Sequence, residues 1–191
     1  KIPGRNDLLE VPRYHKYQMK LLGVDVHLNT EVTPEMVLKE NPDAVVVATG
    51  SKPRLPRNIP GSDQPNVVNV RDVINEKVAV GQNVLVVDYQ RHIQGLGTAD
   101  FLVQKGKTVQ VITPDIEPAG DMEAITRMAL LQRLYSAGVK IIPSTRLIRI
   151  SGNTVTVGNA LTEEERDIEN IDTVVLALSG VENNELYYSL K

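Results

Sequence analysis

The residues best suited to bind a ligand lie in a polar turn that follows a run of four apolar residues. The turn begins at Asp88 and carries Arg91 and His92 before it reaches Gly95. Four apolar residues in a row are typical of a strand buried on both faces, and a helix after the turn would begin near Leu96. The unpaired backbone N–H groups of such a helix start, with Arg91 or His92 adding charge, are suited to an anion such as a phosphate. We therefore expect an anion pocket at the carboxyl end of this strand.

The glycine pattern that usually makes such a turn bind a dinucleotide is incomplete here. In G-x-G-x-x-G turns, the first glycine permits a tight bend and the second lets the backbone approach a pyrophosphate. Counting back from Gly95, those two places hold Gln90 and His92, and the turn opens with Asp88, whose carboxylate would face an anion. Gly95 and Ala99 keep the third role, which is close packing of the helix on the strand. The turn therefore predicts the fold more strongly than it predicts a phosphate site.

The end of the next strand, at Thr113, is the second place where a nucleotide would be recognised. NAD sites usually carry an acidic residue there for the ribose hydroxyls, and NADP sites have an arginine nearby. This sequence has Thr113 and Pro114, then Asp115, and the next arginine is Arg127. The residues therefore do not distinguish between NAD, NADP and a plain adenine nucleotide such as ADP as the ligand.

An α/β fold with a parallel sheet is needed to hold these turns at one edge. Buried strands are predicted at 43–50, 83–88, 108–112 and 172–178, with a short strand at 139–143 and a half-exposed one at 24–28. Helices are predicted from Asn6 or Asp7 to about Leu22, and at 34–40, 69–76, 95–105, 121–137 and 184–190. A β-meander is predicted over 145–151, 154–157 and 163–168. This order is typical of a Rossmann-like three-layer parallel sheet with a β-meander.

A proline-rich stretch divides the chain. Three prolines between residues 52 and 61 exclude a helix or a sheet interior, so this stretch should be an extended crossover between subdomains. The stretches 41–50 and 170–180, one on each side of it, share one pattern: an aspartate, about five apolar residues and a small-residue turn. Similar strands close each half of a flavoprotein with two dinucleotide domains.

Composition excludes several classes of function. The 191 residues carry a net charge of −3 and are 41% hydrophobic, so nothing favours a nucleic-acid partner. No apolar run approaches the roughly 20 residues of a membrane helix and no signal peptide is expected, so no membrane partner is expected either. The absence of cysteine excludes disulfides, thiol catalysis and iron–sulfur ligation, and suits the cytoplasm. No catalytic site is predicted, and His15, His27 and His92 lack partners at metal-ligand spacing, so no metal site is predicted either.

Six short segments, at residues 3–5, 21–24, 28–33, 47–51, 94–102 and 183–187, match a known family of enzymes. Through them the sequence resembles the C-terminal part of flavin oxidoreductases of the 2,4-dienoyl-CoA reductase and trimethylamine dehydrogenase group. The N-terminal half of those proteins is an Old Yellow Enzyme-like barrel. The Ala-Thr-Gly strand end at 48–50 is shared by many two-domain flavoproteins, whereas the 94–102 segment after a non-glycine turn is much more specific.

The resemblance implies a division into domains and cofactors. Residues 52–178 would be an inserted nucleotide-binding domain, and residues 1–51 and 179–191 would be parts of a glutathione-reductase-like flavin domain. In that flavin domain, Ala48, Thr49 and Gly50 would approach a flavin nucleotide. FAD, FMN and a 4Fe–4S cluster are expected in the parent enzyme only, because the segments that would hold them are expected to lie outside this chain.

Two functions follow as alternatives. The chain is either the nucleotide-binding segment of a flavin-dependent NAD(P)H oxidoreductase, which positions a pyridine nucleotide for electron transfer to flavin, or a ligand-free structural module that docks in a larger enzyme. The rest of the parent flavoenzyme is the expected partner in both, and we expect no catalysis by the chain alone. If residues 1–50 lack sheet neighbours, an exposed strand edge should pair, and a homodimer is expected as well.

Overall fold

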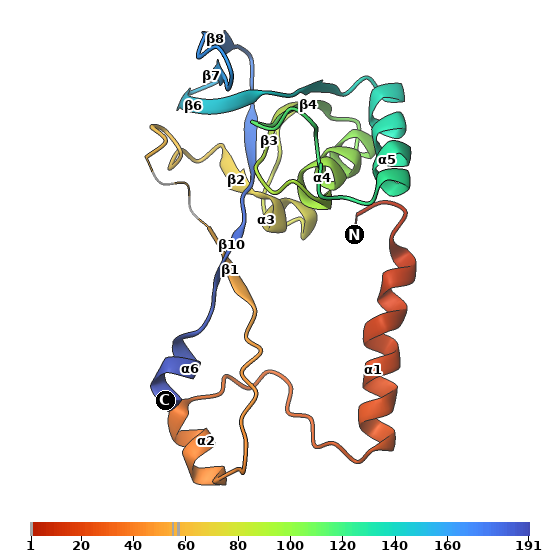
Figure 1. Ribbon diagram of the computed structural model, residues 1–191, viewed down its shortest axis with the longest axis vertical. Helices are drawn as coiled ribbons and strands as arrows, with labels where there is room; N and C mark the ends of the chain where they lie inside the picture. Colours follow the sequence, from red (N-terminus) through yellow and green to blue (C-terminus); the bar gives the residue numbers. More distant parts are fainter. Residues whose placement is uncertain (1, 55, 57) are drawn as a thin grey trace. The chain divides into compact units, whose positions relative to one another are not determined.

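A five-stranded parallel sheet forms the centre of the larger part of the chain (Figure 1). The computed structural model describes residues 2–54, 56 and 58–191. The chain divides into two compact units, one made of residues 1–4 and 53–179 and the other of residues 5–52 and 180–191. The sheet lies in the first unit, together with the polar turn that follows Asp88.

The strands of the sheet lie in the order β2 (Val67–Asn69), β9 (Thr173–Ala177), β3 (Asn83–Asp88), β4 (Thr108–Ile112) and β5 (Lys140–Ile142), and every neighbouring pair is parallel. The register places Val86 of β3 between Val111 of β4 and Val175 of β9. The prediction that the strands at 83–88, 108–112 and 172–178 lie side by side is therefore confirmed. β2 is a strand that the sequence pattern did not predict.

Three helices supply the layer on one face of the sheet: α3 (Val70–Ile74), α4 (Ile93–Gln104) and α5 (Ala124–Ser136). Val86 and Val111 point to this side and pack with Leu96 and Leu102 of α4 and Leu134 of α5. Burying side chains of this size contributes roughly 1.5–3 kcal/mol each to folding. The apolar runs at 84–87 and 109–112 thus become strands because both of their faces find cover.

The other face is covered by the β-meander of β6 (Thr145–Ser151), β7 (Thr154–Asn159) and β8 (Glu165–Ile168). Leu85 and Val87 of β3 pack there with Leu147, Val155 and Val157. Successive residues of a strand point to opposite faces, so β3 contributes to both core clusters. The predicted three-layer Rossmann-like fold with a meander is confirmed.

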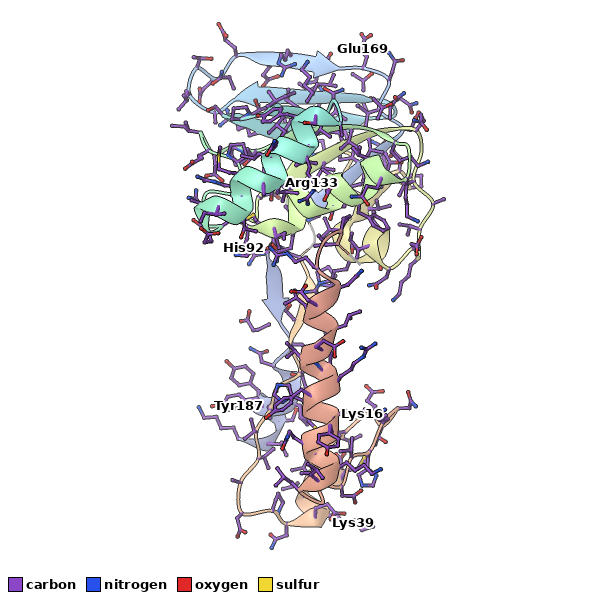
Figure 2. All side chains as sticks on the ribbon, turned by 90° about the vertical axis from the view of Figure 1, so that its right-hand side faces the viewer. Lys16, Lys39, His92, Arg133, Glu169 and Tyr187 are labelled. Atoms are coloured by element: carbon purple, nitrogen blue, oxygen red, sulfur yellow. The ribbon has the colours of Figure 1, made fainter. Side chains whose placement is uncertain are left out.

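The helix α5 begins three residues later than the predicted range of 121–137. Its N-cap is Glu123, whose carboxylate accepts hydrogen bonds at 2.8 Å from the backbone N–H groups of Ile125 and Thr126. Arg133, labelled on α5 in Figure 2, donates a 2.7 Å hydrogen bond to the buried carboxylate of Asp100 on α4. This ion pair fixes α5 against α4, the helix that follows the polar turn.

The second unit holds short elements: η1 (Asn6–Leu9), α1 (Glu10–Leu21), α2 (Pro34–Glu40), β1 (Ser51–Pro53), β10 (Gly180–Glu182) and α6 (Glu185–Leu190). β1 and β10 form a two-stranded sheet. The Thr33 hydroxyl accepts a 3.4 Å hydrogen bond from the Met36 N–H, and Pro34 takes the first helical position, so the predicted start of α2 is confirmed. Within the described residues, no helix is both long enough and apolar enough to cross a bilayer.

Two strands predicted in the second unit are wrong. Residues 24–28 and 43–50 form no ladder, and Val46, at the centre of the second stretch, is 90% exposed. A strand is stable only when neighbours pair with its backbone and cover its side chains, and within the described residues neither stretch lies in a sheet. Only the end of the second stretch is bonded, through Thr49 and Gly50 to Asn183. The predicted crossover at 52–61 contains residues 55 and 57, which lie outside the described residues.

Candidate functional site

The polar turn joins β3 to α4 at the carboxyl end of the parallel sheet. The helix begins at Ile93, with His92 in the N-cap position (labelled in Figure 2), and no side chain caps it. The first free N–H groups therefore belong to residues 93–95. The expectation of a helix start at Leu96 is wrong, because the Leu96 N–H falls inside the hydrogen-bonded helix and its side chain is buried in the core. The helix start itself faces the edge where open parallel sheets bind ligands.

Asp88 fills the beginning of the turn. Its side chain is 1% exposed, its Oδ1 accepts a 3.0 Å hydrogen bond from the Gln90 N–H, and its Oδ2 is buried without a partner. A Cβ on Gly95 would lie 2.3 Å from the Asp88 Cγ, so the glycine is needed for this contact. Burial raises the Asp88 pKa to about 6, against the effect of the Gln90 N–H and with a smaller contribution from the charge of Asp115.

Tyr89 and Gln90 are hydrogen-bonded to the meander and to the segment after β9. The Tyr89 hydroxyl accepts a 2.8 Å hydrogen bond from the Leu147 N–H of β6, and burial raises the pKa of this phenol. The Gln90 amide donates to the Leu178 carbonyl, just beyond β9. Both side chains therefore fix the turn to the sheet and meander, and the Gln90 amide nitrogen already has a partner within the protein.

Arg91 links the turn to the loop that follows β4. Its Nε and Nη2 bond to the Asp121 carboxylate at 3.1 and 3.3 Å, and its Nη1 bonds to Asp115. The Asp121 N–H donates a 2.9 Å hydrogen bond back to the Arg91 carbonyl. These two carboxylates raise the Arg91 pKa, the hydrogen bond from Asp121 being the largest cause. Arg91 also has a φ of +58°, in the left-handed region that glycine usually occupies, so it keeps a glycine-like bend at this place.

Thr113 lies at the start of that loop and is buried. Its N–H donates to the Ile142 carbonyl at 3.2 Å, and its carbonyl accepts from the Thr145 N–H at 2.7 Å. The Thr113 hydroxyl accepts a 3.4 Å hydrogen bond from the Asp115 N–H. Thr113 therefore holds the loop in place, and Asp115, with a side chain that is 21% exposed, is the group that meets solvent.

Of the residues at this edge, sequence reasoning missed Asp121. It was placed inside the predicted helix 121–137, where a carboxylate in the first turn needs no further explanation. The pairing of Arg91 with Asp115 and Asp121 spans 24 and 30 residues, and no local pattern indicates it. Within the described residues, no group of three or more His, Cys, Asp or Glu side chains is placed to hold a metal ion.

The other sequence candidates, Ala48, Thr49 and Gly50, lie in the second unit. The Thr49 hydroxyl donates to the Asn183 carbonyl, and the Asn183 N–H donates to the Gly50 carbonyl at 3.0 Å. With Tyr187, labelled in Figure 2, these residues line a surface pocket of about 220 Å³. No protein atom lies within 4 Å of a Cβ on Gly50, so within the protein the φ of +71° is what favours glycine there.

Comparison with known proteins places the chain among flavin- and nucleotide-linked oxidoreductases. Residues 25–190 match the family of pyridine nucleotide-disulphide oxidoreductases. N,N-dimethylglycine/sarcosine dehydrogenase of Chromohalobacter salexigens is 31% identical, over 100% of this chain and 29% of that protein. A probable N-methylproline demethylase of Rhizobium meliloti is 29% identical, over 99% of this chain and 28% of that protein. A 2-naphthoyl-CoA reductase structure is 27% identical with a TM-score of 0.89, over 100% of this chain and 28% of that chain. The chain thus spans less than a third of each relative.

Proposed function

The chain belongs to the pyridine nucleotide-disulphide oxidoreductase family, and on this premise we propose that it is the nucleotide-binding segment of a flavin-dependent NAD(P)H oxidoreductase. The resemblance drawn from the sequence, to the C-terminal part of a group of flavin oxidoreductases, is confirmed at the level of the family. In this proposal residues 52–178 bind the nucleotide, while residues 1–51 and 179–191 belong to a flavin-type domain.

The uncapped start of α4 is the observation that carries the proposal. It lies at the carboxyl end of β3, in the middle of a parallel sheet, with free N–H groups at residues 93–95. The positive end of the helix dipole and unpaired N–H groups together favour a phosphate. Gly95 permits the close approach of α4 to β3 at this point. The residues present therefore fit a nucleotide diphosphate, although the first two glycines of the usual fingerprint are replaced.

The redox chemistry in this proposal is supplied by bound cofactors: a nicotinamide delivers a hydride and a flavin accepts it. The chain's own residues bind and orient. The first turn of α4 holds the diphosphate, Asp115 and Thr113 border the adenosine end, and Ala48, Thr49 and Gly50 line a pocket for part of the flavin nucleotide. No side chain is assigned to proton or hydride transfer.

A ligand-free structural module is the second candidate, and one observation favours it. The polar side chains of the turn are already bonded within the protein: Tyr89 to Leu147, Gln90 to Leu178, and Arg91 to Asp115 and Asp121. The buried carboxyl of Asp88 also lies against Gly95, beside the start of α4. In this alternative the turn is a structural link of sheet, meander and loop.

Titration calorimetry of the chain with NADH, NADPH and ADP separates the two candidates. The proposal expects at least one dissociation constant below about 1 mM, which corresponds to roughly −4 kcal/mol of binding free energy. Heats that stay at the level of dilution up to roughly 5 mM nucleotide would favour the structural module.

A variant tests whether the helix start is the binding point. Gln94→Glu places a carboxylate in the first turn of α4, where it repels a phosphate. We expect weaker nucleotide binding by about fivefold or more, measured on protein whose folding is verified by circular dichroism, because the Gln94 Oε1 is buried without a partner. Gln132→Glu adds the same charge to the exposed side of α5 and is the matched control, for which affinity should not change. Equal affinity in both variants would place the ligand elsewhere.

A further inference from the structure

The three side chains Arg91, Asp115 and Asp121 form a connected ion cluster, which we call the Arg91 clasp. One guanidinium bonds to two carboxylates, and it does so with three of its nitrogen atoms. The backbone adds a fourth link, from the Asp121 N–H to the Arg91 carbonyl at 2.9 Å. The clasp therefore holds the loop after β4 against the turn after β3, at the edge of the sheet where α4 begins.

The charge of the clasp is negative. Its single cation faces two carboxylates, and the neighbouring carboxyl of Asp88 adds further negative charge above its pKa of about 6. Residues 113–127 contain one basic side chain, Arg127, which is only 14% exposed; its Nη2 pairs with Glu117, and its Nε and Nη1 are buried without a partner. A 2′-phosphate that reached this loop would therefore find no exposed cation without a carboxylate partner there and would be repelled by the carboxylates.

The position of Asp115 matches the place where dinucleotide sites recognise the adenosine ribose. The residue follows β4 by three positions, and β4 is the neighbour of β3 in the parallel sheet. Its Oδ1 is bonded to Arg91, whereas its Oδ2 has only a 3.5 Å contact with the Thr113 hydroxyl. One partly exposed carboxylate oxygen thus keeps free capacity to accept hydrogen bonds from a ribose diol.

We propose that the Arg91 clasp makes this site select nucleotides whose adenosine ribose carries a free 2′-hydroxyl, such as NADH and ADP, and reject 2′-phosphorylated ones such as NADPH. Asp115 accepts hydrogen bonds from the ribose hydroxyls. Arg91 is a positioning residue, because its charge is already compensated by two carboxylates and is not available to a 2′-phosphate. Asp121 completes the neutralisation of Arg91. The inference rests on the proposed nucleotide-binding function and specifies the ligand class of that same site.

Calorimetry with NADH and NADPH tests the proposal, because the two differ only in the 2′-phosphate. For the unmodified chain we expect NADH to bind at least about tenfold more tightly than NADPH. Asp115→Asn should weaken the binding of NADH and reduce the ratio of the NADH affinity to the NADPH affinity. Asp115→Asn combined with Asp121→Asn leaves Arg91 uncompensated and should bring the ratio to about one or invert it. Asp63→Asn, which removes one exposed carboxylate before β2, is the control and should leave the ratio unchanged.

The possible outcomes distinguish failure of the proposed selectivity from failure of the proposed nucleotide binding. Equal affinity for NADH and NADPH in the unmodified chain would overturn the selectivity and leave nucleotide binding in place. An unchanged ratio in both the single and the double variant, with folding verified by circular dichroism, would also overturn it. Absence of binding by either nucleotide would overturn both. The single variant Asp121→Asn, which leaves Asp115 and Arg91 bonded, supplies the same comparison should the double variant fail to fold, with a smaller expected decrease in the ratio.

Discussion

The carboxyl group of Asp88 lies directly against Gly95, so that the side chain of the last residue of β3 touches the backbone of the first turn of α4. A Cβ on Gly95 would lie 2.3 Å from the Asp88 Cγ and 2.6 Å from its Oδ2. The same Oδ2 is buried without a hydrogen-bond partner, close to the start of a helix that no side chain caps. The beginning of α4 thus has two properties at once: it attracts negative charge, and it already has a buried carboxyl beside it.

Gly95→Ala should destabilise the fold, although alanine is the better helix former. Helix propensity would favour alanine by about 1 kcal/mol, but the new methyl group would collide with Asp88, and overpacking of this kind costs about 1–3 kcal/mol. We expect a net loss of about 1–2 kcal/mol in urea unfolding. Gly97→Ala is the matched control, because a Cβ there would meet apolar side-chain atoms, the Ile2 Cγ2 at 2.9 Å and Cδ1 at 3.0 Å, and no buried carboxyl group. A Gly95→Ala variant as stable as the parent would contradict the contact.

Asp88→Asn should change the pH dependence of stability. The pKa of Asp88 is raised from 3.8 to about 6, so the folded state holds this proton more tightly than the unfolded chain does. The stability that the proton brings is therefore complete below pH 3.8 and is lost as the pH rises through about 6, by about 3 kcal/mol at most. The asparagine variant lacks this loss.

The measurement for Asp88 is the free energy of unfolding at a series of pH values between 4 and 8, taken as the difference between the variant and the parent. Other carboxyl groups, such as Glu123 with its lowered pKa, titrate in both proteins and cancel in the difference. The variant should gain relative stability as the pH rises from about 4 to about 7. A difference that is flat over this window would show that Asp88 titrates normally.

The sequence predicts the central unit well because its strands have neighbours on both sides. The stretches 41–50 and 170–180 share one pattern, yet the second contains the buried strand β9 while the first is exposed chain. Their residues are equally suited to a strand, so the difference comes from pairing and cover, which a local pattern does not contain. The Arg91 clasp is beyond sequence reasoning for the same reason, since two loops must first be brought together by the sheet.

The second unit should make the isolated chain associate. Its apolar side chains are widely exposed, with Val46 at 90% and Leu22 at 76%, and unpaired apolar chain of this kind tends to self-associate. We expect a concentration-dependent dimer in light scattering after size exclusion. Val46→Glu should weaken that association by about tenfold or more, because a charge would have to be buried. Leu161→Glu, on the exposed turn after β7, is the matched control. A monomer at all concentrations would contradict this expectation.

Arg91→Ala should loosen the loop after β4 while leaving the sheet intact. The guanidinium donates the hydrogen bonds to the carboxylates of Asp115 and Asp121. Without them, the hydrogen bond from the Asp121 N–H to the carbonyl of residue 91 is the one link that remains, within the described residues, between this turn and Asp121. Local opening then costs less, and amide hydrogen exchange in segment 115–122 should become faster by about tenfold, whereas exchange in β3 and β4 should not change. Arg149→Ala, an exposed arginine of the meander, is the control and should leave exchange in this loop unaltered. Unchanged protection of segment 115–122 in Arg91→Ala would show that the Arg91 side chain is not needed to hold the loop. Faster exchange confined to that segment would show that one side chain, anchored in the turn before α4, sets the order of the edge at which a nucleotide is proposed to bind.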